Sequence, residues 1–84
     1  MTTTVYTQIT VDTNGTKGTA KLHGSCKIEI GDESLGYTVH DLIETDQVRA
    51  SVDAEELQKL ETDRDITAIH YYYRLSSRDA WHSP

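Results

Sequence analysis

The sequence predicts an α+β domain in which a mainly antiparallel sheet of four or five strands carries one helix on a face. Three observations lead to this prediction: a hairpin signal at Asn14-Gly15, a capped amphipathic segment after Asp53, and a β-forming run over residues 66–75. The expected order of elements is β-β-β-β-α-β. The order β-β-α-β-α-β remains an alternative.

The first two strands are predicted from the turn between them. Asn14-Gly15 tolerates the positive φ angles of a type I′ turn, so the alternating residues on either side are expected to pair as a hairpin. One register sorts the two faces well, because it sets Ile9 opposite Ala20 among apolar residues and Asp12 opposite Lys17 among polar ones.

The second strand is expected to be longer than its partner. Apolar and polar residues continue to alternate through Cys26 and Ile28, so residues 25–30 should extend past the first strand, with Gly24 as a bulge or bend. An overhanging strand exposes backbone hydrogen-bonding groups. Cys26 shares the apolar face and is interpreted as a small buried hydrophobic residue.

Residues 37–52 admit two interpretations. In the favoured one, Thr45-Asp46 closes a second hairpin, although Asp41 would then point toward an apolar face. In the other, Thr38 caps a short helix that has Asp41 at its third position.

A helix over residues 54–62 and a final strand complete the predicted fold. Asp53 is a suitable N-cap, Glu55 and Glu56 suit the first helical turn, and apolar residues recur at helical spacing. Residues 66–75 are rich in Ile, Thr and Tyr and carry apolar side chains on both faces, which is typical of a central strand.

Length and composition indicate one small soluble domain. Residues 1–75 are expected to form the domain and residues 76–84 a polar tail, with a thin core because only 36% of the residues are hydrophobic. No stretch has the roughly 20 apolar residues of a membrane span, and the first residues do not resemble a secretory signal. Cys26 is the only cysteine. A cytoplasmic location, in the producing or a host cell, is therefore expected.

Negative charge is concentrated in the middle of the chain. Of the fourteen carboxylates, twelve lie between Glu29 and Asp65, where only Arg49, Lys59 and Arg64 oppose them, so this stretch has a net charge of −9. Such a segment repels nucleic acid and anionic membranes and attracts basic protein surfaces. Its charges also suit turns and a helix N-terminus, so solvated surface is the competing interpretation.

The charge favours a small, non-enzymatic protein-binding module. We expect an inhibitor or adaptor that occupies the basic site of a nucleic-acid-handling protein, as a nucleic-acid mimic would, and that does not bind nucleic acid itself. Small viral proteins that counter host defences often work in this way, so a phage anti-defence role fits. The predicted partner-binding residues are Asp32, Glu33, Asp46, Glu55, Glu56, Glu61, Asp63, Asp65, Tyr72 and Tyr73.

The tyrosine run at residues 71–73 has a second interpretation. Rings that alternate along a strand can stack on nucleic-acid bases, but base-stacking sheets normally carry basic residues around them. The acidic composition therefore favours core packing, with an outward Tyr72 or Tyr73 contacting a protein partner.

Two other functions are weaker expectations. The overhanging second strand could pair with another copy, giving a homodimer or a self-assembling protein. An enzyme using Asp41 or His40 is the least favoured, because no motif supports a catalytic residue. The four histidines lack partners at metal-ligand spacing, so neither a metal nor a cofactor is expected.

Overall fold

The computed structural model describes residues 2–14, 20–29 and 39–84. Over these residues the fold is α+β, as predicted, with a three-stranded antiparallel sheet instead of four or five strands and with three short helices instead of one. In chain order the elements are β1 (Thr2–Thr13), β2 (Lys21–Glu29), α1 (Val39–Leu42), α2 (Thr45–Ala50), α3 (Ala54–Glu61) and β3 (Ile66–Arg74).

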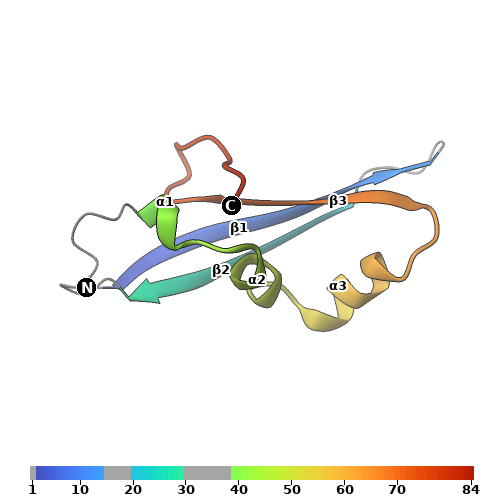
Figure 1. Ribbon diagram of the computed structural model, residues 1–84, viewed down its shortest axis with the longest axis horizontal. Helices are drawn as coiled ribbons and strands as arrows, with labels where there is room; N and C mark the ends of the chain where they lie inside the picture. The colour runs from blue at the N-terminus through green and yellow to red at the C-terminus, as the bar shows by residue number, and fades with distance from the viewer. Residues whose placement is uncertain (1, 15–19, 30–38) are drawn as a thin grey trace.

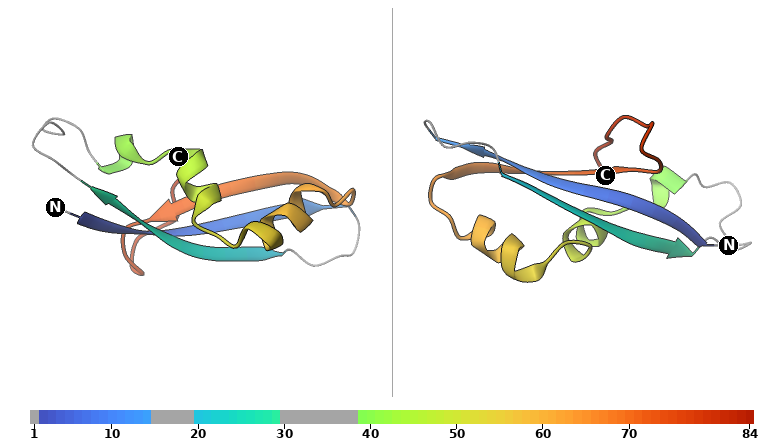
Figure 2. Two further views of the ribbon diagram at one scale, coloured as in Figure 1. Left: turned by 90° about the horizontal axis from the view of Figure 1, so that it is seen from below. Right: turned by 180° about the vertical axis from the view of Figure 1, so that it is seen from behind.

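The helices α2 and α3 cover one face of the sheet, as Figures 1 and 2 show. The strand order is β2-β1-β3, and α2 contacts all three strands. The molecule is 48 Å long and 24 Å by 18 Å across. Its length follows from β1, because twelve extended residues span about 40 Å. No helix in the described ranges is long and apolar enough to cross a membrane.

The central strand β1 supplies three of the eight buried hydrophobic residues in the described part of the chain, more than any other element. Val5, Ile9 and Val11 point toward the helices and are at most 1% exposed, because alternate residues of a strand lie on the same face. The buried cluster around Val5 and Ile9 is completed by Ile28 from β2, Tyr73 from β3, Ile43 from the link between α1 and α2, Val48 from α2 and Leu57 from α3. We call the face of the sheet opposite the helices the outer face.

The hairpin of β1 and β2 is confirmed, but its register differs by two residues from the predicted one. Ile9 lies opposite Leu22, not Ala20. A shift of two residues keeps every side chain on its predicted face, so the apolar pattern could not distinguish the two registers. Gly15 and Lys17 lie outside the described residues, so neither the predicted turn nor the Asp12–Lys17 pairing is described.

The second strand does not extend past the first over the residues described. Cys26 pairs with Val5 and Glu29 pairs with Thr2, because the actual register uses β1 from its first residue. The predicted overhang is therefore wrong for residues 25–29, while residue 30 is outside the described ranges. Gly24 pairs regularly with Thr7 instead of forming a bulge.

Residues 39–42 and 45–50 form two short helices, so the favoured second hairpin is wrong. Thr45-Asp46 begins α2 instead of closing a turn. The backbone N–H of Glu44 donates to Oε1 of Gln47 at 2.7 Å, which stabilises the start of this helix. The helical path places Ile43 and Val48 in the core and leaves Asp41 exposed, so no carboxylate has to be buried. Thr38, the proposed cap, lies outside the described residues.

The predictions for α3 and β3 are confirmed in type and position. Oδ1 of Asp53 accepts a hydrogen bond from the backbone N–H of Glu56 at 3.0 Å, and Leu57 is buried. The strand β3, however, lies at an edge of the described sheet, not at its centre. The apolar residues on the two faces of β3 are in different environments, because the helices cover only one face of the sheet.

Candidate functional site

The predicted acidic residues that the structure describes all lie in the helical layer or in the turn after it. Asp46 is in α2, Glu55, Glu56 and Glu61 are in α3, and Asp63 and Asp65 lie between α3 and β3; all six are exposed. We call these six residues the acidic helical surface. Asp32 and Glu33 lie outside the described residues.

The fold separates negative from positive charge. Residues 39–65 contain nine carboxylates against three cations, which gives the helical layer a net charge of −6. On the outer face, Lys21 and Lys27 of β2 and Arg74 of β3 are accompanied only by Asp12 and Glu29 among the described strand residues. The two faces of the molecule therefore differ in electrostatic character, although the whole chain is acidic.

Some acidic side chains already have partners within the chain. Nη2 of Arg49 donates to both carboxylate oxygens of Glu61, at 2.9 Å and 3.1 Å. This hydrogen bond and the negative charge of Glu61 raise the pKa of Arg49 above its ordinary value. Oδ1 of Asp63 accepts from the backbone N–H of Asp65 at 2.9 Å. A partner would have to compete with Arg49 for Glu61, whereas Glu55 and Glu56 extend from the first turn of α3.

The two tyrosines predicted to bind a partner have different positions. Tyr72 lies half-buried on the outer face, where its ring stacks against His70 with 6.3 Å between ring centroids. Tyr73 is only 3% exposed and belongs to the core, so its ring is not presented to a partner. The run of tyrosines therefore alternates between faces, as the strand geometry requires.

Tyr73 also belongs to a cluster of three rings with His40 and His82. Its hydroxyl lies 2.7 Å from Nδ1 of His40, and the two histidine rings are 4.9 Å apart. Burial, and secondly the charge of Asp41, raises the pKa of Tyr73. Over the described ranges, no three His, Cys, Asp or Glu side chains form a group that could hold a metal ion.

The C-terminal segment, which the sequence describes only as a polar tail, folds back on β3. The backbones of Tyr73 and His82 exchange two hydrogen bonds, of 2.9 Å and 2.8 Å, after a turn at residues 76–79. Residues paired across antiparallel strands share a face, so His82 joins Tyr73 while its neighbour Trp81 falls beside Arg74 on the other side. Figure 1 shows this segment on the side of the sheet opposite α2 and α3.

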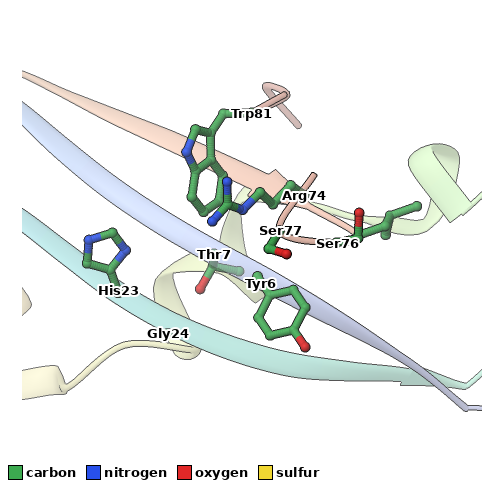
Figure 3. Close-up of a pocket in the computed structure, with 9 residues that line it drawn as sticks. Tyr6, Thr7, His23, Gly24, Arg74, Ser76, Ser77 and Trp81 are labelled. Atoms are coloured by element: carbon green, nitrogen blue, oxygen red, sulfur yellow. The ribbon is translucent and has the colours of Figure 1, made fainter. Parts of the chain in front are cut away.

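Trp81 and Arg74 form one side of an open pocket of about 480 Å³ on the outer face. The Arg74 guanidinium carbon lies 4.2 Å from the centroid of the Trp81 ring, and Figure 3 shows the two groups side by side. Tyr6, from β1, is 46% exposed. The lining residues are Tyr6, Thr7, His23, Gly24, Arg74, Leu75, Ser76, Ser77 and Trp81.

Sequence reasoning missed this pocket but contained part of the signal. The alternation of the first two strands places Tyr6 and His23 on the polar face, and Arg74 follows from alternation along the last strand. Trp81 carries no such signal, because only the return of the chain along β3 sets it against Arg74.

Comparison with known proteins adds no relative from which a role could be transferred. The chain matches no protein-family model, no curated protein and no solved structure. The function is therefore argued from the two surfaces described above.

Proposed function

We propose that this chain is a small protein-binding module, an inhibitor or adaptor, whose acidic helical surface occupies the basic site of a nucleic-acid-handling protein. One observation supports the proposal above the others: the six residues of the acidic helical surface are all exposed, and the four in α2 and α3 lie on the side of the sheet away from Lys21, Lys27 and Arg74. Acidic and basic residues on opposite faces can orient the molecule as it approaches a basic partner.

The arrangement also suits the mimicry of phosphates. Carboxylates held on a helix and on the turn after it are fixed in position, and Asp63 is further held by its hydrogen bond to the Asp65 backbone. A basic groove that normally binds phosphates offers Arg and Lys side chains, which pair equally well with carboxylates. Association of this type is driven by charge and should weaken steeply with salt.

The alternative of self-assembly through an overhanging strand has lost its premise. Residues Cys26–Glu29 pair along β1, so the described part of β2 has no unpaired extension.

The proposal is tested by capture and competition. The tagged protein should retain a nucleic-acid-binding protein from a lysate of its producing or host cell, and that partner should be released both by salt and by added DNA or RNA. Replacing Glu55, Glu56 and Asp63 with Lys should abolish capture by the folded variant.

A control variant with the same change in net charge is available elsewhere in the chain. Replacing Asp12, Glu29 and Asp79 with Lys also adds six positive charges, but none of these three residues lies in the helical layer. This variant should still capture the partner. Equal loss in both variants would mean that net charge alone matters, and unchanged capture by the first variant would overturn the proposal.

A further inference from the structure

The outer-face pocket has the chemistry of a site for a ligand that is both aromatic and anionic. It combines an exposed ring, Tyr6, with a cation, Arg74, whose guanidinium lies over a second ring, Trp81. Rings alone would suit any apolar group, and a cation alone would suit any anion. The combination matches the two parts of a nucleotide, because aromatic side chains stack on bases and arginine pairs with phosphate.

Arg74 has no acidic partner of its own. Within the part of the chain that the structure describes, the ion pairs of Glu61 and Asp12 are with Arg49 and His70, not with Arg74. The Nε–H of Arg74 is buried and has no hydrogen-bond acceptor. That nitrogen is too deeply buried to meet a ligand. Arg74 as a whole is only partly buried and lines the pocket, so the rest of its guanidinium can meet an anion there.

The carboxylates of the outer face lie far from the pocket. Asp12 is six residues along β1 from Tyr6, which corresponds to about 20 Å, and its carboxylate accepts from or pairs with Nε2 of His70 at 2.8 Å. Glu29 lies opposite Thr2, four residues or about 13 Å from Tyr6, and accepts a hydrogen bond from the Thr2 hydroxyl. The carboxylates of the strands therefore do not reach the pocket. Asp79, which is exposed in the turn at residues 76–79, is the nearest carboxylate along the chain, two residues from Ser77 and from Trp81.

The size and the other lining groups fit the same ligand. A volume of about 480 Å³ lies within the range of about 300–1,000 Å³ that is usual for small-molecule sites. His23 and the hydroxyl groups of Ser76 and Ser77 add hydrogen-bonding groups around the rings, as Figure 3 shows. From these observations we infer that the pocket binds a nucleotide, with its base against the Tyr6 side and its phosphate at Arg74.

This site lies on the face opposite the acidic helical surface, so it is independent of the proposed function. The expectation that the chain does not bind nucleic acid came from its overall charge, and the separation of charge removes that objection for the outer face. The shared chemistry is a base joined to a phosphate. Its source is either a free nucleotide or a nucleotide within a single strand.

Calorimetric titration of the full chain with adenosine monophosphate tests the inference. Adenosine and inorganic phosphate, titrated separately, should each bind at least about tenfold more weakly, because each lacks half of the recognised chemistry. The only tryptophan of the chain is Trp81, so its fluorescence should change on binding. A matched titration with oligothymidylate identifies the source of the ligand. Much tighter binding of the oligonucleotide than of the mononucleotide indicates single-stranded nucleic acid, and equal affinity per nucleotide indicates a free nucleotide.

Variants locate the site. Arg74→Gln and Tyr6→Ala should each weaken binding by about tenfold or more, by loss of the phosphate partner and of the stacking ring. Arg78→Gln removes the same charge from an exposed arginine that does not line the pocket, and should change the affinity less than about twofold. The lysine triple variant of Glu55, Glu56 and Asp63 should retain the site, which separates this test from that of the proposed function.

Three results would overturn the inference. They are no heat and no Trp81 response at millimolar nucleotide, equal affinity for inorganic phosphate alone, or equal losses in Arg74→Gln and Arg78→Gln. The wild-type titrations decide the first two even if a variant fails to fold. A doubled mass that nucleotide does not reverse would show instead that a second copy covers the outer face.

Discussion

At Gly24 the backbone of β2 lies directly against the backbone of the helical layer. A Cβ atom at this position would lie 2.3 Å from the backbone oxygen of Ser51, just after α2, and 3.1 Å from Oγ1 of Thr7. The side chains of Thr7 and Ser51 are themselves hydrogen-bonded, which ties β1 to the same point. The lack of a side chain at Gly24 therefore lets α2 sit against the strands.

We expect Gly24→Ala to lower the free energy of unfolding by about 1–3 kcal/mol, because the added methyl group forces a backbone shift. Urea unfolding followed by circular dichroism measures the change. Ser25→Ala, at the next and exposed position of β2, should change stability by less than about 0.5 kcal/mol. Equal stability of Gly24→Ala and the wild type would show that α2 does not rest on the sheet at this point.

Tyr73 gives the protein a predicted sensitivity to high pH. Its pKa is raised from the ordinary value of 10.0, mainly by burial, so the folded state holds the phenolic proton more tightly than the unfolded state does. Stability is therefore unaffected by this group below pH 10 and falls as the pH rises above that value. Tyr73→Phe, which has no phenolic proton, should show a smaller fall.

The measurement is the free energy of unfolding of both proteins at pH 7 and between about pH 9 and 11. The difference between the two proteins at pH 7 measures the loss of the hydrogen bond to His40. Only the slope of the free energy of unfolding against pH above about pH 9 reflects the ionisation of the Tyr73 hydroxyl. Identical slopes for Tyr73→Phe and the wild type would be evidence against this role for the residue.

At the scale of single elements, the helix α3 illustrates what local sequence can predict. Asp53, the first-turn glutamates and the buried Leu57 all lie within nine residues of one another, and the structure contains the predicted cap hydrogen bond. Local signals of this kind need no distant partner, because a helix satisfies its backbone groups within itself.

The cap of α3 supports a direct prediction. Asp53→Ala should lower the free energy of unfolding by about 1 kcal/mol, because the backbone N–H of Glu56 loses its acceptor. Asp53→Asn keeps an oxygen at the same place and should retain most of the stability. Thermal unfolding distinguishes the two variants. Equal loss in both would point to the charge of Asp53 and not to its hydrogen bond.

The elements between β2 and α3 show where local signals are insufficient. Residues 39–50 alternate well enough to resemble a hairpin, yet they form α1 and α2. Helical geometry sets Ile43 and Val48 onto the sheet and leaves Asp41 in solvent. The burial of two large apolar residues without a buried carboxylate favours the helix, and that comparison requires knowledge of the sheet on which they pack.

At the scale of the whole molecule, stability depends on a thin core around β1. A chain of 84 residues has a free energy of unfolding of about 4–13 kcal/mol at the usual values per residue. Ile9, 0% exposed, lies in the middle of the buried cluster. A single large cavity there would remove much of the total.

Ile9→Ala should therefore lower the free energy of unfolding by about 2–5 kcal/mol, by loss of buried surface and by the cavity that remains. Chemical denaturation at neutral pH measures it. Thr4→Ala is the control, because Thr4 lies on the same strand but is exposed on the outer face, and it should cost no more than about 1 kcal/mol. A small effect of Ile9→Ala would mean that the layers are not packed around β1.

The distribution of charge is also a property of the whole molecule. The sequence locates the carboxylates between Glu29 and Asp65, but it cannot say which of them share a surface. Folding turns the linear cluster into a layer, because α2 and α3 pack on one face of the sheet and their polar sides remain outside. The outer-face pocket arises in the same way, from residues 6, 23, 74 and 81, which are distant in the chain.

Patterns in the sequence were sufficient to predict the α+β class, the faces of the strands, the position and cap of α3, and the acidic character of residues 39–65. These features depend on side-chain periodicity and local hydrogen bonds, which a linear pattern contains. The packed fold was needed to establish the register of β1 and β2, the two short helices within residues 39–50, the edge position of β3 and the contact of Trp81 with Arg74. Each of these features depends on which distant segments pair with or bury one another. The free energies of the competing arrangements differ only when those segments are in contact, so a local sequence pattern cannot distinguish them.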